Sequence, residues 1–195
     1  FDTKMPIVMG ILNVTPDSFS DGGTHADHDE AVAHALCMVE EGAQIVDVGG
    51  ESTRPGAELV SVEEEKARTI DVVRALAERG LCVSIDTRHA EVARAAVEAG
   101  ASIVNDVSGF RDPAMVDVAR SCDAGLVVVH MQGEPGTMQE NPTYDDVVVE
   151  VRDYLVGQAA LLEQAGVARD RICLDPGPGF GKTPKQTLEL VRNLH

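Results

Sequence analysis

The sequence has no tryptophan and few other aromatic residues: they make up 3% of its 195 residues, whereas 44% of the residues are hydrophobic. The core is therefore expected to be aliphatic, in a chain long enough for one large domain. Basic residues are also scarce, since 16 Lys and Arg stand against 33 Asp and Glu, a formal net charge of −17. With no run of Lys or Arg, nothing indicates a nucleic-acid partner.

Long apolar stretches and paired cysteines are missing as well. No run approaches about 18 apolar residues, so neither a membrane span nor a signal peptide is expected. These absences predict a cytoplasmic protein. No CxxC spacing occurs among the cysteines, which are expected to be small buried hydrophobes in a reducing compartment; they are Cys37, Cys82, Cys122 and Cys173.

One pattern recurs along the chain: a helix-like segment ends in glycine, and a short apolar run follows, as in "EEGAQIVDVGG" and "ERGLCVSIDT". Runs such as 43–48 and 102–104 are too short for amphipathic helices and predict strands buried on both faces. Six such strands begin near residues 7, 45, 82, 102, 125 and 172. The glycines expected to end the helices are Gly42, Gly80, Gly100, Gly125 and Gly166.

Helix start signals lie between these runs. Ser61–Glu64 reads as a capping box, and Asp112 and Thr183 each precede a proline that suits the first helical position. Alternating strands and helices predict a parallel α/β fold, and the spacing of about 33 residues matches a (β/α)₈ TIM barrel. We therefore expect a single barrel domain over residues 1–195 with about six of eight units; a doubly wound open sheet is the alternative.

Polar residues stand where the predicted strands stop, each before a loop rich in Gly, Ser, Thr or Pro. In a (β/α)₈ barrel the carboxyl ends of the strands meet at the face that carries the active site. Turn formation would explain polar residues at one or two of these strand ends, but a shared site explains all six strand ends better. These residues are Asn13, Asp47, Asp86, Asn105 with Asp106, His130 and Asp175.

Several familiar motifs fail on inspection. "LDPGPGFGKT" ends like a phosphate-binding loop, but Pro176 stands where its first glycine is required. "GESTR" has Arg54 where a nucleophile elbow needs glycine. Lys182 in the first of these stretches is either a solvated loop lysine or a group that reaches an anion.

Taken together and in order, "MGILNVTPDSFSDGG", "DVGGESTRPGA", "SIDT", "NDVSG", "HMQGEPGTMQENPTYDDVV" and "LDPGPGFGKT" resemble the dihydropteroate synthase family. The resemblance runs from about residue 5 to the end of the chain. It implies a (β/α)₈ barrel that joins 6-hydroxymethyl-7,8-dihydropterin pyrophosphate to p-aminobenzoate in folate synthesis. It further implies Mg²⁺, a homodimer, small-molecule substrates and inhibition by sulfonamides.

The same resemblance implies roles for single residues. Asn13 matches the residue that contacts the metal, and Thr53 and Arg54 match residues that contact phosphate and shape the p-aminobenzoate site. Asp86, Asn105 and Asp175 match residues that bind the pterin; here the residues agree independently, because a carboxylate can accept the paired N–H groups of a pterin edge. Apolar contacts to the pterin and to p-aminobenzoate are expected from Met131 and Phe180, for which core packing is the alternative.

The expected mechanism needs no protein nucleophile: pyrophosphate leaves first, and the arylamine attacks the resulting pterin cation. Segments 15–23 and 52–57 are expected to be lids that exclude water.

The sequence departs from the family after the sixth unit, where the Ser-x-Lys and Arg-x-His of the last two strands have no counterpart. We therefore expect a piece with trimmed ends that is inactive or unstable by itself. A pterin-dependent methyltransferase domain and a non-catalytic pterin-binding paralogue are the alternative functions.

Overall fold

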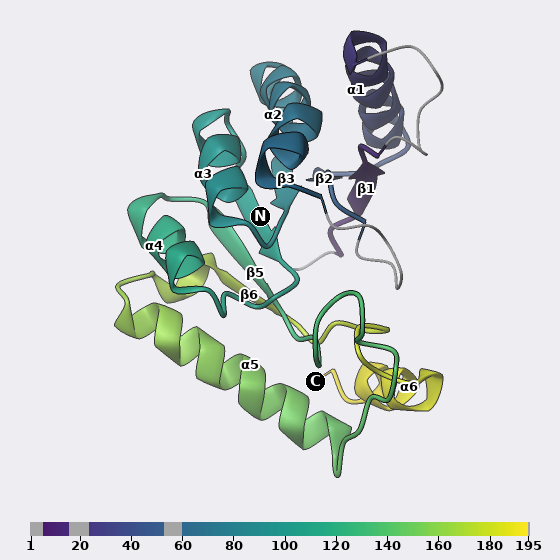
Figure 1. The fold of residues 1–195 in the computed structure, drawn as a ribbon, viewed down its shortest axis with the longest axis vertical. Helices are drawn as coiled ribbons and strands as arrows, with labels where there is room; N and C mark the ends of the chain where they lie inside the picture. Colours follow the sequence, from purple (N-terminus) through teal and green to yellow (C-terminus); the bar gives the residue numbers. More distant parts are fainter. Residues whose placement is uncertain (1–5, 16–23, 53–59, 195) are drawn as a thin grey trace. The chain divides into compact units, whose positions relative to one another are not determined.

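The structure is a computed structural model and describes residues 6–15, 24–52 and 60–194. Strands and helices alternate along the chain as predicted (Figure 1). The described residues up to Asn105 form one compact unit, and those from Asp106 on form another. The prediction that residues 1–195 make a single domain stays a prediction.

The first unit contains four parallel strands, paired in the order in which they occur along the chain. A doubly wound sheet would instead reverse its strand order near the first strand. The sequential order therefore disfavours the open-sheet alternative. The elements are β1 (Met9–Asn13), α1 (Thr24–Glu40), β2 (Ile45–Gly49), α2 (Val62–Glu78), β3 (Val83–Asp86), α3 (Ala90–Glu98) and β4 (Ile103–Asp106).

The helices of the first unit lie side by side, with α2 between α1 and α3 (Figure 1). Val72, Val73 and Leu76 on α2 are completely buried, and so are the side chains of Val46 and Val48 on β2. Burial on both faces is the reason that β2 reads as a nearly continuous apolar run.

The second unit pairs β5 (Gly125–Val129) with β6 (Ile172–Asp175) in parallel. Its helices are α4 (Pro113–Ser121), α5 (Val147–Gln164) and α6 (Pro184–Arg192), and a 3-10 turn at Arg169–Arg171 precedes β6. The long helix α5 contacts both strands, and α4 and α6 pack against α5.

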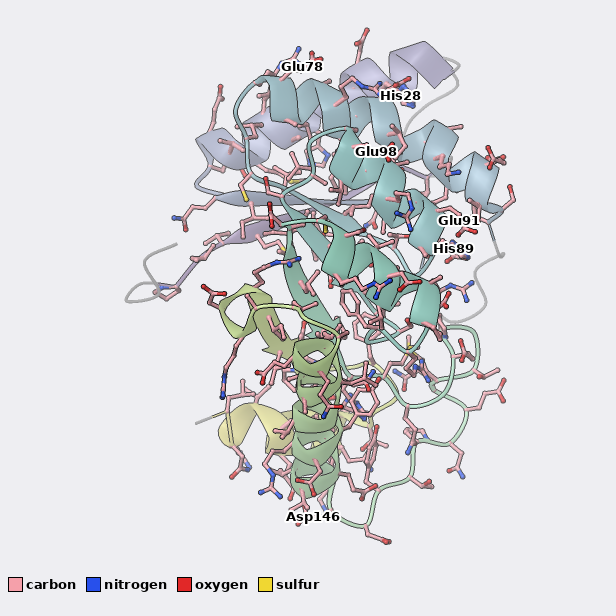
Figure 2. The ribbon with its side chains drawn as sticks, turned by 90° about the vertical axis from the view of Figure 1, so that its left-hand side faces the viewer. His28, Glu78, His89, Glu91, Glu98 and Asp146 are labelled. Atoms are coloured by element: carbon pink, nitrogen blue, oxygen red, sulfur yellow. The ribbon has the colours of Figure 1, made fainter. Side chains whose placement is uncertain are left out.

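Local caps explain where several helices begin. The side chains of Asp112 and Thr183 accept hydrogen bonds from the first turns of α4 and α6, and Thr183 with Gln186 completes a capping box. Asp146, labelled at the start of α5 in Figure 2, accepts from two backbone N–H groups. Ser61 accepts from Glu64 N as predicted, but Glu64 turns its carboxylate to Arg68 instead of returning it to Ser61.

Two expectations, about where one helix ends and about the burial of the cysteines, are wrong. Gly125 does not end a helix: α4 stops at Ser121, Cys122 is already extended, and Gly125 begins β5. Cys37 and Cys173 are exposed, and Cys82 and Cys122 are half-buried, because these side chains do not face the aliphatic core.

Strand burial differs from the expectation too. β1 and β6 are only partly buried, since each pairs with a single neighbour within its unit. Asp47 does not end its strand but lies in the middle of β2, which continues to Gly49.

The excess of acidic residues lies largely at the surface. Glu78 on α2 and Glu91 and Glu98 on α3 are exposed, and Figure 2 shows them on the outer side of these helices. None of the helices in the described ranges has the length and apolar character that a membrane span requires.

Candidate functional site

One row of residues crosses the carboxyl ends of the four strands in the first unit. Asn13 on β1 is in register with Gly49 on β2, Gly49 with Asp86 on β3, and Asp86 with Asn105 on β4. Side chains in register on parallel strands point to the same face of a sheet. Three of the residues that the sequence singled out, Asn13, Asp86 and Asn105, are therefore brought together by strand pairing alone.

The glycine in this row, itself buried, places no side chain between two of the polar groups. A Cβ built on Gly49 would lie 3.5 Å from Asp86 Oδ2 and 3.7 Å from Asn13 Oδ1. The side chain of Asn13 is itself exposed. Any larger residue at position 49 would occupy the volume in which a ligand could meet both Asn13 and Asp86.

Beneath this row lies a buried pair of polar side chains. Asn105 Nδ2 donates to Asp47 Oδ2 over 2.9 Å, whereas Asp47 Oδ1 and Asn105 Oδ1 are buried and have no partner. Burial raises the pKa of Asp47, and the hydrogen bonds to its carboxylate oppose that shift. Because a carboxylate only accepts, Asn105 must turn its NH₂ group to Asp47 and present its carbonyl oxygen elsewhere. Unpaired buried acceptors are costly and call for donors.

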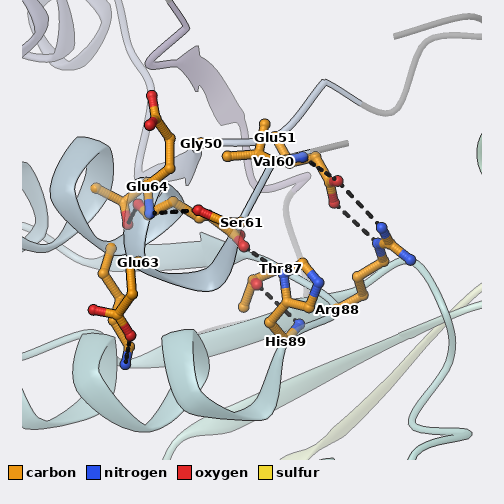
Figure 3. A network of polar contacts seen from close by, with 12 residues as sticks. Gly50, Glu51, Val60, Ser61, Glu63, Glu64, Thr87, Arg88 and His89 are labelled. Carbon is orange, nitrogen blue, oxygen red and sulfur yellow. Dashed lines mark hydrogen bonds and ion pairs between the residues drawn. The ribbon is translucent and has the colours of Figure 1, made fainter. Parts of the chain in front are cut away.

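The loop that follows β2 is held by a polar network at its two stems (Figure 3). Arg88 donates to both carboxylate oxygens of Glu51, over 2.9 and 3.2 Å, and Glu51 Oε1 accepts from Val60 N over 3.3 Å. The Arg88 guanidinium holds the pKa of Glu51 below its usual value despite burial, which acts in the opposite direction. Thr53 and Arg54, the residues expected to contact phosphate, lie between these stems and outside the described residues.

A second part of this network anchors the start of α2 and the loop before α3. The carboxylate of Glu65, 1% exposed, lies 2.6 Å from His89 Nδ1, and Arg68 donates to Gly50 O over 2.8 Å. Thr87 Oγ1 accepts from His89 N over 3.1 Å. The base of the 53–59 segment is thus fixed by residues from α2 and from the turn after β3.

In the second unit, Asp175 stands at the end of β6. Its Oδ1 accepts from Gly177 N over 2.7 Å, and its backbone oxygen accepts from His130 N over 2.9 Å. Met131 is buried and packs with the half-buried Phe180 in one apolar cluster, which also contains Val107, Val127, Val129 and Met138. Met131 and Phe180 therefore do pack in a core, but in a core at the ends of β5 and β6.

Lys182 is neither a solvated loop residue nor directed at open space. Only 2% of it is exposed, and its Nζ lies 2.8 to 3.1 Å from four acceptors: His130 Nδ1, His130 O, Gly177 O and Phe180 O. Burial lowers the pKa of Lys182 to about 8, against the attraction of Asp175. Burial, together with the Lys182 charge, lowers the pKa of His130 to about 4.

Two of the polar strand ends have structural partners. Asp106 is completely buried, and its two carboxylate oxygens accept from Ser108 N and Phe110 N, each over 2.7 Å. It shapes the turn in which Phe110 has a positive φ of 58°. His130 is held by Lys182 and stacks edge-on against Tyr154. The turn-forming alternative therefore fits Asp106, and a packing role fits His130.

Sequence reasoning missed Gly49, Glu51 and Arg88. Glu51 belongs to the quoted "GGESTRPGA" stretch, but its partner is 37 residues away and nothing local indicates it. Among the residues that the structure describes, no group of three or more His, Cys, Asp or Glu could hold a metal by itself.

The alternating units and the sequential parallel strands define a member of the parallel α/β barrel class, in which active sites lie at the carboxyl ends of the strands. Comparisons with known proteins give the same class. A family described as pterin binding enzymes matches residues 9–195. This chain is similar to the solved dihydropteroate synthase of Yersinia pestis with a sulfonamide drug complex. The two structures superpose with a TM-score of 0.92 at 42% identity, and the match covers 100% of this chain and 71% of the other.

Curated relatives are more specific. Dihydropteroate synthase of Escherichia coli K12 is 51% identical over 194 residues, which are 99% of this chain and 69% of that protein. The Xanthomonas albilineans enzyme, solved with 4-aminobenzoic acid, has a TM-score of 0.90 at 48% identity, over 98% of this chain and 68% of its own. The chain belongs to the pterin binding enzymes and, among them, to the dihydropteroate synthases, transferases of folate biosynthesis. Its fold is the (β/α)₈ barrel, of which it spans about six units.

Proposed function

We propose that this chain binds 6-hydroxymethyl-7,8-dihydropterin pyrophosphate at its strand ends and joins it to p-aminobenzoate, giving 7,8-dihydropteroate and pyrophosphate. The observation that carries the proposal is the row of Asn13, Gly49, Asp86 and Asn105, with an unpaired buried acceptor, Asn105 Oδ1, in it. A pterin ring edge, with its amide N–H beside an amino group, supplies the donor that this acceptor lacks.

Each polar residue then has a defined part in binding the pterin. Asn105 presents a carbonyl oxygen, because Asp47 takes its NH₂ group. Asp86 presents a carboxylate in the same row. Asp175 Oδ1 accepts from Gly177 N, and the Asp175 carboxylate also accepts from the paired N–H groups of the pterin. Met131 and Phe180, packed in one cluster, supply apolar contact to the pterin and to p-aminobenzoate.

The pyrophosphate end of the substrate requires a cation, which we propose is Mg²⁺. When bound, Mg²⁺ neutralises charge on the leaving pyrophosphate. The residues present fit this ion: the exposed Asn13 offers an amide oxygen beside Gly49, and Mg²⁺ commonly takes few protein ligands and relies on waters and substrate phosphates. Thr53 and Arg54 would contact the phosphates from the loop whose stems Glu51 and Val60 form.

No protein nucleophile is needed for this reaction. The bond between the pterin methylene carbon and the pyrophosphate oxygen breaks first, and the pterin ring stabilises the cation that is left. The amine of p-aminobenzoate then attacks that carbon and loses a proton. The chain binds, orients and excludes water, which are the contributions that polar strand ends and apolar walls can make.

Further properties accompany this function. We propose that the protein acts in the cytoplasm as a homodimer and that sulfonamides compete with p-aminobenzoate for it. The solved Yersinia pestis relative with a sulfonamide drug complex supports the last point.

The test is pyrophosphate release by the complete protein, with the pterin pyrophosphate and Mg²⁺, in the presence and absence of p-aminobenzoate. Release that requires p-aminobenzoate, yields dihydropteroate and stops with a chelator supports the proposal. Asn13→Ala should weaken the response to Mg²⁺, and Asp175→Ala should abolish pterin binding. Pterin binding without turnover would instead support the non-catalytic paralogue, and the absence of both would overturn the site.

A further inference from the structure

We propose that Lys182 is a positioning residue: its ammonium group ties the loop after β6 to the end of β5 and so fixes Asp175 and Phe180 for the substrates. The inference rests on the proposed function for what these two residues bind. It assigns Lys182 a part that neither of the sequence-based alternatives contained.

The ammonium group of Lys182 has no free hydrogen-bond donor. An ammonium has three N–H donors and no acceptor. The four acceptors around Lys182 Nζ, at 2.8 to 3.1 Å, use all three donors, so none is left for an anion. Charge-assisted bonds of this kind are stronger than neutral ones, and breaking them in a buried place leaves carbonyl groups unpaired.

The acceptors of Lys182 come from two segments that are far apart in the sequence. His130 directly follows β5, whereas Gly177 and Phe180 belong to the loop after β6. His130 Nδ1 and Lys182 Nζ are separated by 52 positions in the sequence. One side chain therefore joins the segment before Met131 to the segment that carries Phe180.

The loops after β5 and β6 lie close together around this contact. Gly177 and Gly181 both have positive φ angles, of 61° and 60°, and a Cβ on either would collide with the backbone of the β5 loop. Tyr144 also donates its hydroxyl to Gly181 O over 2.8 Å, and Gln139 Nε2 donates to Gly179 O. The loop after β6 is thus held against the β5 loop, with Lys182 as its buried charged contact.

Asp175 is positioned by the same arrangement. Its Oδ1 accepts from Gly177 N, and the carbonyl of Gly177 is one of the acceptors of Lys182. Gly177 O also accepts from Phe180 N, so loss of the ammonium group would remove one of its two donors and loosen the turn in which Gly177 N holds the Asp175 carboxylate. The same loss would also release the Phe180 carbonyl, and hence the ring that contacts the apolar cluster.

The test compares Lys182→Met, which keeps the length of the side chain and removes its charge, with Lys182→Ala, in the complete protein. The control is Lys185→Met, a change at an exposed lysine in the first turn of α6. Hydrogen exchange of peptides covering 176–183 should become on the order of tenfold faster in both Lys182 variants, while β5 and α5 keep their protection. KM for both substrates should rise by about tenfold, more than kcat falls.

Chemical rescue provides a second test, because an added amine would not restore KM if Lys182 only filled space. Lys182→Ala removes three methylene groups and the ammonium, so n-propylammonium should restore the low KM and the slow exchange, whereas propanol should not. Unchanged loop exchange, equally faster exchange in every segment, or equal rescue by propanol would overturn the proposal. Failure of the wild-type protein to bind pterin would refute the proposed function alone, because the exchange measurement needs no substrate.

Discussion

Arg88 and Glu51, 37 residues apart, form a two-pronged ion pair in which Glu51 also accepts from the backbone N–H of Val60. The side chains are 24% and 11% exposed, so solvent screens the pair less than a surface ion pair. This pair closes the base of a segment that carries Thr53 and Arg54. It links the turn after β3 to the loop expected to contact phosphate.

Arg88→Met should therefore impair substrate binding more than it impairs folding. Without the guanidinium, Glu51 keeps only its hydrogen bond from Val60 N, and the two stems are no longer tied to the turn after β3. We expect KM for the pterin pyrophosphate to rise on the order of tenfold and the free energy of unfolding to fall by about 1 to 2 kcal/mol. Steady-state kinetics and urea unfolding would measure both.

Arg74→Met is the matched control, since Arg74 pairs with Asp71 on the exposed side of α2 with side chains that are 49% and 63% exposed. Such a surface pair contributes about 0 to 1 kcal/mol and should leave KM unchanged. If both variants raise KM equally, the loop-stem role of Arg88 is wrong.

Gly49→Ala should place a methyl group between Asn13 and Asp86 in the row of strand ends. The added methyl group would lie 3.5 Å from Asp86 Oδ2 and 3.7 Å from Asn13 Oδ1, which are ordinary contact distances. The variant should fold normally yet bind the pterin pyrophosphate about tenfold or more weakly. Calorimetric titration with the substrate measures the loss. Tight binding by a folded Gly49→Ala protein would show that the ligand does not enter between Asn13 and Asp86.

The alternation of elements was predictable because its signals are local. Gly42, Gly80, Gly100 and Gly166 have positive φ, as expected where helices end. The caps at Asp112 and Thr183 are confirmed for the same reason. Gly125 failed because glycine also begins strands: nothing in "CDAGLVVV" distinguishes a helix end from a strand start.

Part of the candidate site was predictable because it depends on strand pairing and not on side-chain packing. Parallel pairing brings strand ends together whatever the loops do, so Asn13, Asp86 and Asn105 could be grouped before any coordinates were known. Asp47 and Lys182 could not be placed in this way. Asp47 is a carboxylate within a strand, and the partners of Lys182 include an imidazole 52 residues distant. Side-chain contacts over such separations depend on packing, which sequence periodicity does not specify.

Acidification should destabilise the chain partly through His130. Its pKa falls from 6.5 to about 4 on folding, so the unfolded chain binds a proton in this window and the folded chain does not. The contribution of His130 to stability is therefore present above pH 6.5 and is lost as the pH falls to about 4. His130→Asn, which keeps an acceptor for Lys182, should flatten the fall of the melting temperature between these pH values.

Burial raises the pKa values of Asp47 and Asp106, so these two groups oppose the loss of stability on acidification. The effect of His130 is therefore read from the difference between the melting-temperature profiles of the variant and the wild type. His34→Asn, a change at an exposed histidine of α1, is the control and should leave the pH profile unaltered. Identical pH profiles for His130→Asn and the wild type would contradict the assignment of a buried neutral imidazole.

Neighbouring residues at the end of β4 should give different phenotypes. Asp106→Ala removes an acceptor shared by Ser108 N and Phe110 N, so it should lower the free energy of unfolding by about 2 to 4 kcal/mol. Asn105→Ala takes one donor from the buried Asp47 carboxylate and should cost about 1 to 3 kcal/mol, but unlike Asp106→Ala it should also weaken pterin binding by about a hundredfold. Urea unfolding and pterin titration on the two variants separate the roles. Equal losses of stability in both variants, with equal binding, would mean that the whole strand end is structural and that the pterin contacts lie elsewhere.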